Sequence, residues 1–203
     1  EEKAEGDKKS VGLSGALKIK GVLFLLTGFF AYCAAEATAM HWASTYFSEV
    51  RHIPAEGSAT LASLFYIGIT TGRFLSGFIT DRLGDRKMII AGTAVLVTGI
   101  GLLLIPVDSY IFAVIAFIVI GFGCAPIYPC MIHSTPYNFG KENSGAIIGI
   151  QMASAYVGST FIPPLFGFIG NMIGFNIMPF YLLVFVILMI TMTEMTFKIT
   201  KNK

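Results

Sequence analysis

The chain has 203 residues, of which 55% are hydrophobic and 13% are charged, and its formal net charge is +2. Soluble domains carry about a quarter charged residues, so this composition excludes a soluble enzyme, a nucleic-acid-binding protein and a disulfide-stabilised scaffold. The small net charge gives no reason to expect anionic partners.

Long uncharged stretches divide the chain into six apolar spans. Between Met88 and Gly140 the only charged side chain is Asp108, and between Asn143 and Thr193 there is none. A membrane-spanning helix needs about 20 apolar residues, and lipid requires backbone polar groups to be satisfied within the segment. The sequence therefore predicts an all-α membrane protein. We expect a six-helix bundle over 19–198, with spans at 19–47, 57–79, 88–105, 110–134, 143–170 and 175–197, a cytoplasmic linker or tail at 1–18 and a cytoplasmic tail at 199–203.

The distribution of Lys and Arg predicts the orientation of these spans. Twelve of the 14 basic residues fall in the two termini, the 81–87 loop and the loop at Lys141, all on one side. The opposite side has only Arg51, and Arg73 lies inside the second span. Because Lys and Arg concentrate in cytoplasmic loops, we expect both termini in the cytoplasm and the chain in the cell membrane.

Prolines and cysteines lie within the apolar stretches. A proline inside a membrane helix removes a backbone hydrogen bond and kinks the rod. Such a kink serves packing, or it marks a discontinuous helix beside a substrate path; the candidates are Pro126, Pro129, Pro163 and Pro164. The three cysteines show no disulfide or metal-binding spacing and are expected to be packing residues, so we expect no metal and no cofactor.

The most specific motif is GFITDRLGDRK at residues 77–87, between the second and third spans. It resembles the G-x-x-x-D-R-x-G-R-[KR] signature of the major facilitator superfamily, with Asp85 in a place where a basic residue often stands. The signature residues are Gly77, Asp81, Arg82, Gly84, Arg86 and Lys87. The resemblance implies half of a twelve-helix fold, built of two inverted three-helix repeats, and a second six-helix half from the same full-length chain as partner. Residues 1–10 look like the end of the linker that joins such halves, so we interpret the chain as the C-terminal half.

Three stretches are similar to fucose-permease-like sugar transporters within that superfamily. They are YCAAE at 32–36 with Trp42, GCAPIYP at 123–129, and residues 158–167 around Pro163 and Pro164. This similarity implies a sugar as substrate.

The signature loop is expected to act as a conformational latch. Asp81 ends the second span, and the fifth span starts with Asn143 and Ser144. A carboxylate that faces a helix N-terminus is stabilised by about 0.3–1 kcal/mol, so we expect Asp81 to face that terminus in one conformation. The alternative is an ordinary solvated cytoplasmic loop.

Glu36 is an ionisable residue near mid-span. Such residues cost roughly 2.5–3.5 kcal/mol on insertion scales and mark functional sites. Tyr32 shares its face, and no obvious cation lies opposite in this half. Burial favours the neutral acid, so Glu36 is a candidate proton carrier; the alternative is a structural hydrogen bond.

Four further residues complete the predicted solute and proton pathway. His41 and Trp42 line one cavity with Glu36 only if the helix unwinds; otherwise His41 is a packing residue and Trp42 an interface anchor. Tyr66 shares a stripe with Arg73, which is expected to be a structural partner of the latch loop. Gln151 either binds a hydroxylated solute or holds two helices together.

These features favour a secondary active transporter that works by alternating access. A sugar coupled to protons is the expected cargo, and an exporter of hydrophobic compounds is the alternative. A membrane-embedded enzyme would need clustered catalytic groups, which the sequence lacks, so we expect no enzyme activity. Besides the solute and protons, the lipid bilayer is the expected partner, and no nucleic acid is.

Overall fold

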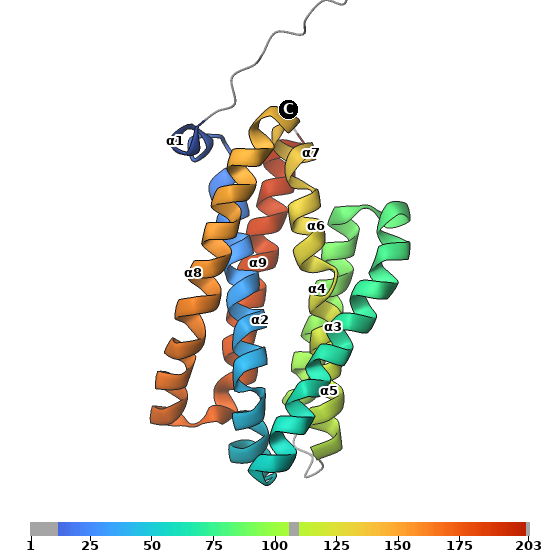
Figure 1. Cartoon of the computed structure of the whole chain (residues 1–203), viewed down its shortest axis with the longest axis vertical. Coiled ribbons are helices and arrows are strands. Elements are labelled where there is room, and N and C mark those ends of the chain that lie inside the picture. The colour runs from blue at the N-terminus through green and yellow to red at the C-terminus, as the bar shows by residue number, and fades with distance from the viewer. Residues whose placement is uncertain (1–11, 106–109, 202–203) are drawn as a thin grey trace, which may run out of the picture.

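The computed structural model describes residues 12–105 and 110–201, which contain helices and no strand. The first part of the expected linker, residues 106–109 after the predicted third span, and the last two residues lie outside these ranges. Figure 1 shows a bundle of long, roughly parallel rods. The elements are α1 (Leu13–Ala16), α2 (Val22–Arg51), α3 (Ala55–Leu83), α4 (Asp85–Leu103), α5 (Tyr110–Cys124), α6 (Ile127–His133), α7 (Thr135–Phe139), α8 (Lys141–Ile173), the 3-10 turn η1 (Phe175–Ile177) and α9 (Met178–Thr200).

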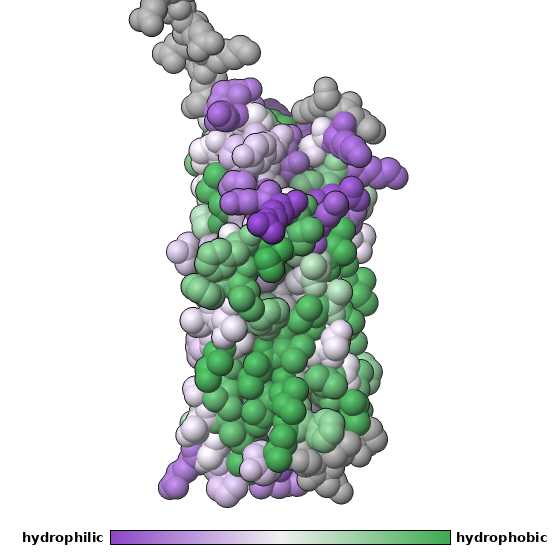
Figure 2. Space-filling model, turned by 90° about the vertical axis from the view of Figure 1, so that its right-hand side faces the viewer, coloured by the Kyte–Doolittle hydropathy of each residue, from purple (hydrophilic) through white to green (hydrophobic). Residues whose placement is uncertain are grey.

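Within residues 12–105 and 110–201, six rods are long enough to cross a bilayer if α5, α6 and α7, which follow one another along the chain, are taken as one. Five also meet a hydropathy criterion for membrane spans: α2, α4, the 110–139 rod, α8, and the segment Phe175–Thr200. The sixth, α3, has 29 residues but includes Glu56, Arg73, Asp81 and Arg82. Apolar surface covers the middle of the molecule and polar side chains gather at its ends (Figure 2).

The long helices pack in two groups, and each group combines helices from both halves of the chain. The first long helix, α2, packs mainly on α8 and α9, whereas α5 packs mainly on α3 and α4. The first helix of each sequence half therefore packs on the second and third helices of the other half. This exchange is the arrangement expected of two three-helix repeats, and it confirms the predicted fold class.

Glycines allow α3 and α5 to approach at backbone distance. A Cβ atom added to Gly68 would overlap the Ile118 carbonyl, and one added to Gly121 would overlap the Phe65 carbonyl. Small residues at such contacts are typical of membrane helix packing, because lipid gives helices no hydrophobic reason to associate.

Prolines have different effects on two of the rods. α5 ends at Cys124, and α6 begins only after Pro126, which has no N–H to continue the helix. In contrast, α8 continues through Pro163 and Pro164. The α5–α6 break and the α8 prolines lie on opposite sides of α2, which places both next to the predicted pathway residues.

Candidate functional site

A polar cluster joins α2 to the break between α5 and α6. The Tyr32 hydroxyl lies 2.8 Å from Oε1 of Glu36 and 3.0 Å from the carbonyl oxygen of Cys124. Tyr32 is buried, and Cys124 is the last residue of α5. A phenol has one hydrogen to donate, so the hydroxyl can serve only one of these two acceptors fully at a time.

Arg73 supplies the positive charge next to this cluster. It interacts electrostatically with the Glu36 carboxylate from the facing helix α3. Arg73 is thus a cation on the neighbouring helix that the sequence did not place near Glu36. The helical stripe on α3 predicted the direction of Arg73, but it could not show that this direction leads toward α2.

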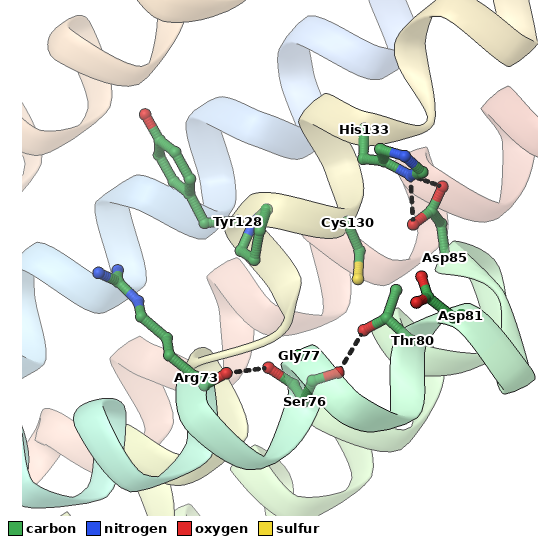
Figure 3. A pocket seen from close by; sticks show the side chains of 10 residues that line it. Arg73, Ser76, Gly77, Thr80, Asp81, Asp85, Tyr128, Cys130 and His133 are labelled. Carbon is green, nitrogen blue, oxygen red and sulfur yellow. Dashed lines mark hydrogen bonds and ion pairs between the residues drawn. The ribbon is translucent and has the colours of Figure 1, made fainter.

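A cavity of about 500 Å³ extends from Arg73 to the signature loop between α3 and α6. Arg73 and Tyr128 lie at one end, and Asp81, Asp85 and His133 lie at the other (Figure 3). The Arg73 guanidinium points away from Asp81. The two charged ends of the cavity are thus separated, with Ser76, Thr80 and Cys130 between them.

A hydrogen bond and an ion pair hold the signature loop to other helices. Nδ1 of His133 on α6 lies 2.9 and 3.0 Å from the two carboxylate oxygens of Asp85. Nε of Arg86 donates across 3.0 Å to Glu194 on α9, and a second guanidinium nitrogen contacts the other oxygen. Sequence reasoning gave His133 no role and did not consider Glu194. The one available signal was Asp85, which departs from the family signature.

The predicted contact between Asp81 and the N-terminus of the fifth span is not formed. Figure 1 separates the α3–α4 junction from the start of α8, with α6 and α7 between them. Asp81 instead lines the cavity with Thr80 and His133. Gly84, with φ of 78°, makes the turn between α3 and α4, a backbone conformation that favours glycine. Arg82 and Lys87 are exposed near this turn.

His41 and Trp42 line a second cavity, of about 590 Å³, against α8. α2 is helical throughout, so the local unwinding needed to bring Glu36 into the same cavity does not occur. Nε1 of Trp42 donates across 2.8 Å to the Pro163 carbonyl. The indole also packs on Gly167 and stacks on Phe175 at 5.3 Å, so Trp42 is a packing and positioning residue.

Gln151 and Tyr66 do not join these cavities. Gln151 is fully buried and accepts a 3.0 Å hydrogen bond from Thr135, so it holds α8 to the α6–α7 bend. This contact supports the structural one of its two predicted roles. Tyr66 is exposed on α3 and contacts Phe65. Within the described ranges, no group of three or more His, Cys, Asp or Glu side chains could hold a metal ion.

The family model of the Major Facilitator Superfamily matches residues 4–202. The chain belongs to this superfamily. Among curated relatives, a mouse (Mus musculus) glucose-6-phosphate exchanger is 36% identical over 84 residues, which are 41% of this chain and 16% of the relative. A probable nitrate/nitrite antiporter of Thermus thermophilus is 24% identical over 183 residues, 79% of this chain and 39% of the relative.

The fold is similar to that of FucP, described as a fucose:proton symporter of E. coli. An outward-facing structure matches with a TM-score of 0.74 and 14% identity, over 95% of this chain and 47% of FucP. A structure of a FucP variant matches with a TM-score of 0.76, also at 14% identity, over 94% and 47% of the two chains. This likeness concerns the fold. The chain spans about half of FucP and two fifths or less of the two curated relatives.

Proposed function

We propose that the chain is one six-helix half of a secondary active transporter that moves a small polar solute, a sugar, together with protons. The family, the fold and the transport functions named for the relatives support this proposal. In this proposal a second six-helix half completes the transporter. The two halves rock about a midplane site, so that the site opens alternately to the two sides of the membrane.

The proposed location is the plasma membrane, with several spans and with both termini in the cytoplasm. Twelve of the 14 Lys and Arg residues lie on the side assigned to the cytoplasm. Figure 2 shows polar side chains concentrated at the end of the molecule that carries the signature loop. The apolar surface below this end is the proposed contact with lipid.

The cluster of Tyr32, Glu36 and the Cys124 carbonyl carries the proposal of proton coupling. When Glu36 is ionised, the Tyr32 hydroxyl donates to the carboxylate. When Glu36 is protonated, the acid donates to Tyr32, and the Tyr32 hydrogen turns to the Cys124 carbonyl, 3.0 Å away. One proton thus changes the bonding between α2 and the end of α5.

This exchange acts at a place where the bundle can bend. The helix is interrupted between Cys124 and Ile127, so fewer backbone hydrogen bonds resist movement there. Arg73 attracts the ionised carboxylate, and that attraction disappears when Glu36 takes up a proton. Protonation would therefore weaken the link to α3 and strengthen the link to α5.

Transport assays on the complete transporter in proteoliposomes test this function. We expect accumulation of radiolabelled L-fucose or another neutral sugar when a pH gradient is applied. Glu36→Gln should abolish accumulation against a gradient but keep exchange of labelled for unlabelled sugar, because the amide preserves shape and hydrogen bonding without binding a proton.

Glu49→Gln, which neutralises an exposed carboxylate near the end of the same helix, is the matched control and should still accumulate sugar. If Glu36→Gln accumulates sugar as well as the unmodified protein does, Glu36 is structural. The coupling group then lies in the other half.

A further inference from the structure

The second cavity is bounded by a stretch of α8 that lacks two helical hydrogen bonds. In an α-helix the N–H groups of positions 163 and 164 would donate to the carbonyls of Ser159 and Thr160. Prolines occupy both positions and have no N–H. Ser159, Thr160, Pro163 and Pro164 all line the cavity, so the two unpaired carbonyls belong to its wall.

The neighbouring carbonyls of Ile162 and Pro163, in contrast, accept hydrogen bonds from side chains. Tyr181 donates across 3.2 Å to the Ile162 carbonyl, and Trp42 donates across 2.8 Å to the Pro163 carbonyl. In the part of the chain that the structure describes, no side chain donates to the carbonyl of Ser159 or Thr160. Ser159 is half-buried and Thr160 is exposed. Two carbonyls without their helical donors are therefore available to a molecule in the cavity, because a backbone carbonyl is a strong acceptor.

The opposite wall adds a third acceptor. Nδ1 of His41 lies 2.7 Å from the Ala37 carbonyl. A carbonyl can only accept, so Nδ1 carries the hydrogen, and in the neutral imidazole Nε2 is then a lone-pair acceptor. The exposed His41 ring lines the cavity together with Thr45.

The lining of this cavity carries no acidic side chain and no Lys or Arg among the described residues. An anion such as a phosphate ester or nitrate would meet carbonyl oxygens with no cation to offset them. A molecule with several hydroxyl groups supplies the donors that these acceptors need.

We infer that this cavity is the subsite where the transporter binds the hydroxyl groups of an uncharged polyhydroxylated solute, a sugar or a polyol. This inference rests on the proposed function and specifies its substrate. The Ser159 and Thr160 carbonyls and Nε2 of His41 accept hydrogen bonds from the solute, and the Thr160 and Thr45 hydroxyls complete the site. Trp42 holds the turn of α8 that contains the two prolines in place.

Restoring the missing N–H groups is the decisive test. In the complete transporter, Pro163→Ala with Pro164→Ala should return both donors to α8 and occupy the two carbonyls. We expect sugar affinity to fall about tenfold or more, the usual effect of losing a good hydrogen bond or two, while thermal stability is unchanged or higher. Pro179→Ala, in the first turn of α9, is the control and should leave affinity unchanged.

The His41 acceptor can be tested separately. His41→Leu should weaken sugar binding about tenfold, whereas His41→Gln, which keeps an acceptor near the Nε2 position, should stay within a few fold of the unmodified protein. If Leu and Gln have equal effects, the acceptor role is wrong.

Binding is measured by thermal stabilisation of the purified transporter with L-fucose, D-glucose, glycerol, glucose-6-phosphate and nitrate, each with and without Na⁺. The neutral sugars should stabilise it without Na⁺. Stabilisation by glucose-6-phosphate or nitrate alone would overturn the inference and the sugar as proposed substrate, and would leave standing only the proposal of a secondary transporter. A site filled by Na⁺ alone would also overturn it. If no compound is bound or transported, both proposals fail.

Discussion

Arg86 on α4 and Glu194 on α9 form a two-point ion pair at the end of the bundle that carries the signature loop. The pair joins the start of one long helix to the last turns of another, 108 positions away in sequence. Its side chains are 48% and 33% exposed, so water screens it. The contact therefore fixes position more than it adds stability.

Breaking this pair should have a small effect on stability. We expect Glu194→Gln to lower the midpoint of thermal unfolding by roughly 2–4 °C at most, because exposed ion pairs contribute little. Thermal unfolding in detergent micelles measures this. The double variant Arg86→Glu with Glu194→Arg restores the pair with reversed charges and should recover the loss; a failure to recover would mean that another contact of Arg86 matters more.

Tyr32→Phe tests whether protonation of Glu36 acts on the end of α5 through the Tyr32 hydroxyl. The variant keeps Glu36 but removes the hydroxyl that links it to the Cys124 carbonyl. We expect uphill accumulation to fall about tenfold or more while exchange continues, measured in the same proteoliposomes. Tyr46→Phe on the same helix, which loses 3.4 Å contacts with the Leu103 carbonyl and with the Arg51 guanidinium, should transport normally. Equal losses in the two variants would speak against a role for the Tyr32 switch.

Asp81→Asn should slow transport without unfolding the chain. Asp81 is exposed at the end of α3, and we propose that it faces the second six-helix half rather than α8. Removal of its charge should change the rate of conformational exchange, not the core. Initial uptake rates and thermal stability check this together. A variant with normal rates would reduce the signature to an ordinary solvated loop.

The proposed topology predicts which positions are reachable from outside intact cells. Cysteines introduced at Glu49 and Glu56 should react with an impermeant thiol reagent, and cysteines at Lys87 and Lys141 should react only after the membrane is permeabilised. The natural cysteines, all buried, serve as the unreactive background. Labelling at position 87 in intact cells would contradict the orientation.

The fold class was predictable because a membrane span requires a long run of residues without charge, and such runs can be recognised in the sequence alone. The interval from Asn143 to Thr193 has no Asp, Glu, Lys, Arg or His. The signature at residues 77–87 then identified the family on its own. These are local signals, and they do not depend on how one helix is rotated against another.

The site was predictable only along single helices. Tyr32 and Glu36 share a face because they are four residues apart on α2. The partner of Tyr32, a carbonyl 92 positions away, depends on how α2 is rotated toward the α5–α6 break. The same is true of Arg73 near Glu36 and of Glu194 near Arg86. Gln151 was ambiguous for this reason: nothing local shows whether an amide faces a cavity or another helix.

The exchange of helices between the two repeats has a consequence for biogenesis. α2 enters the membrane first, but its main partners α8 and α9 begin only at Lys141 and Met178. A nascent chain that stops after α4 has no partner for much of α2, so its small and polar residues face lipid or the insertion machinery. We expect the bundle to close late, when its last helices arrive, because contacts so distant in sequence form slowly.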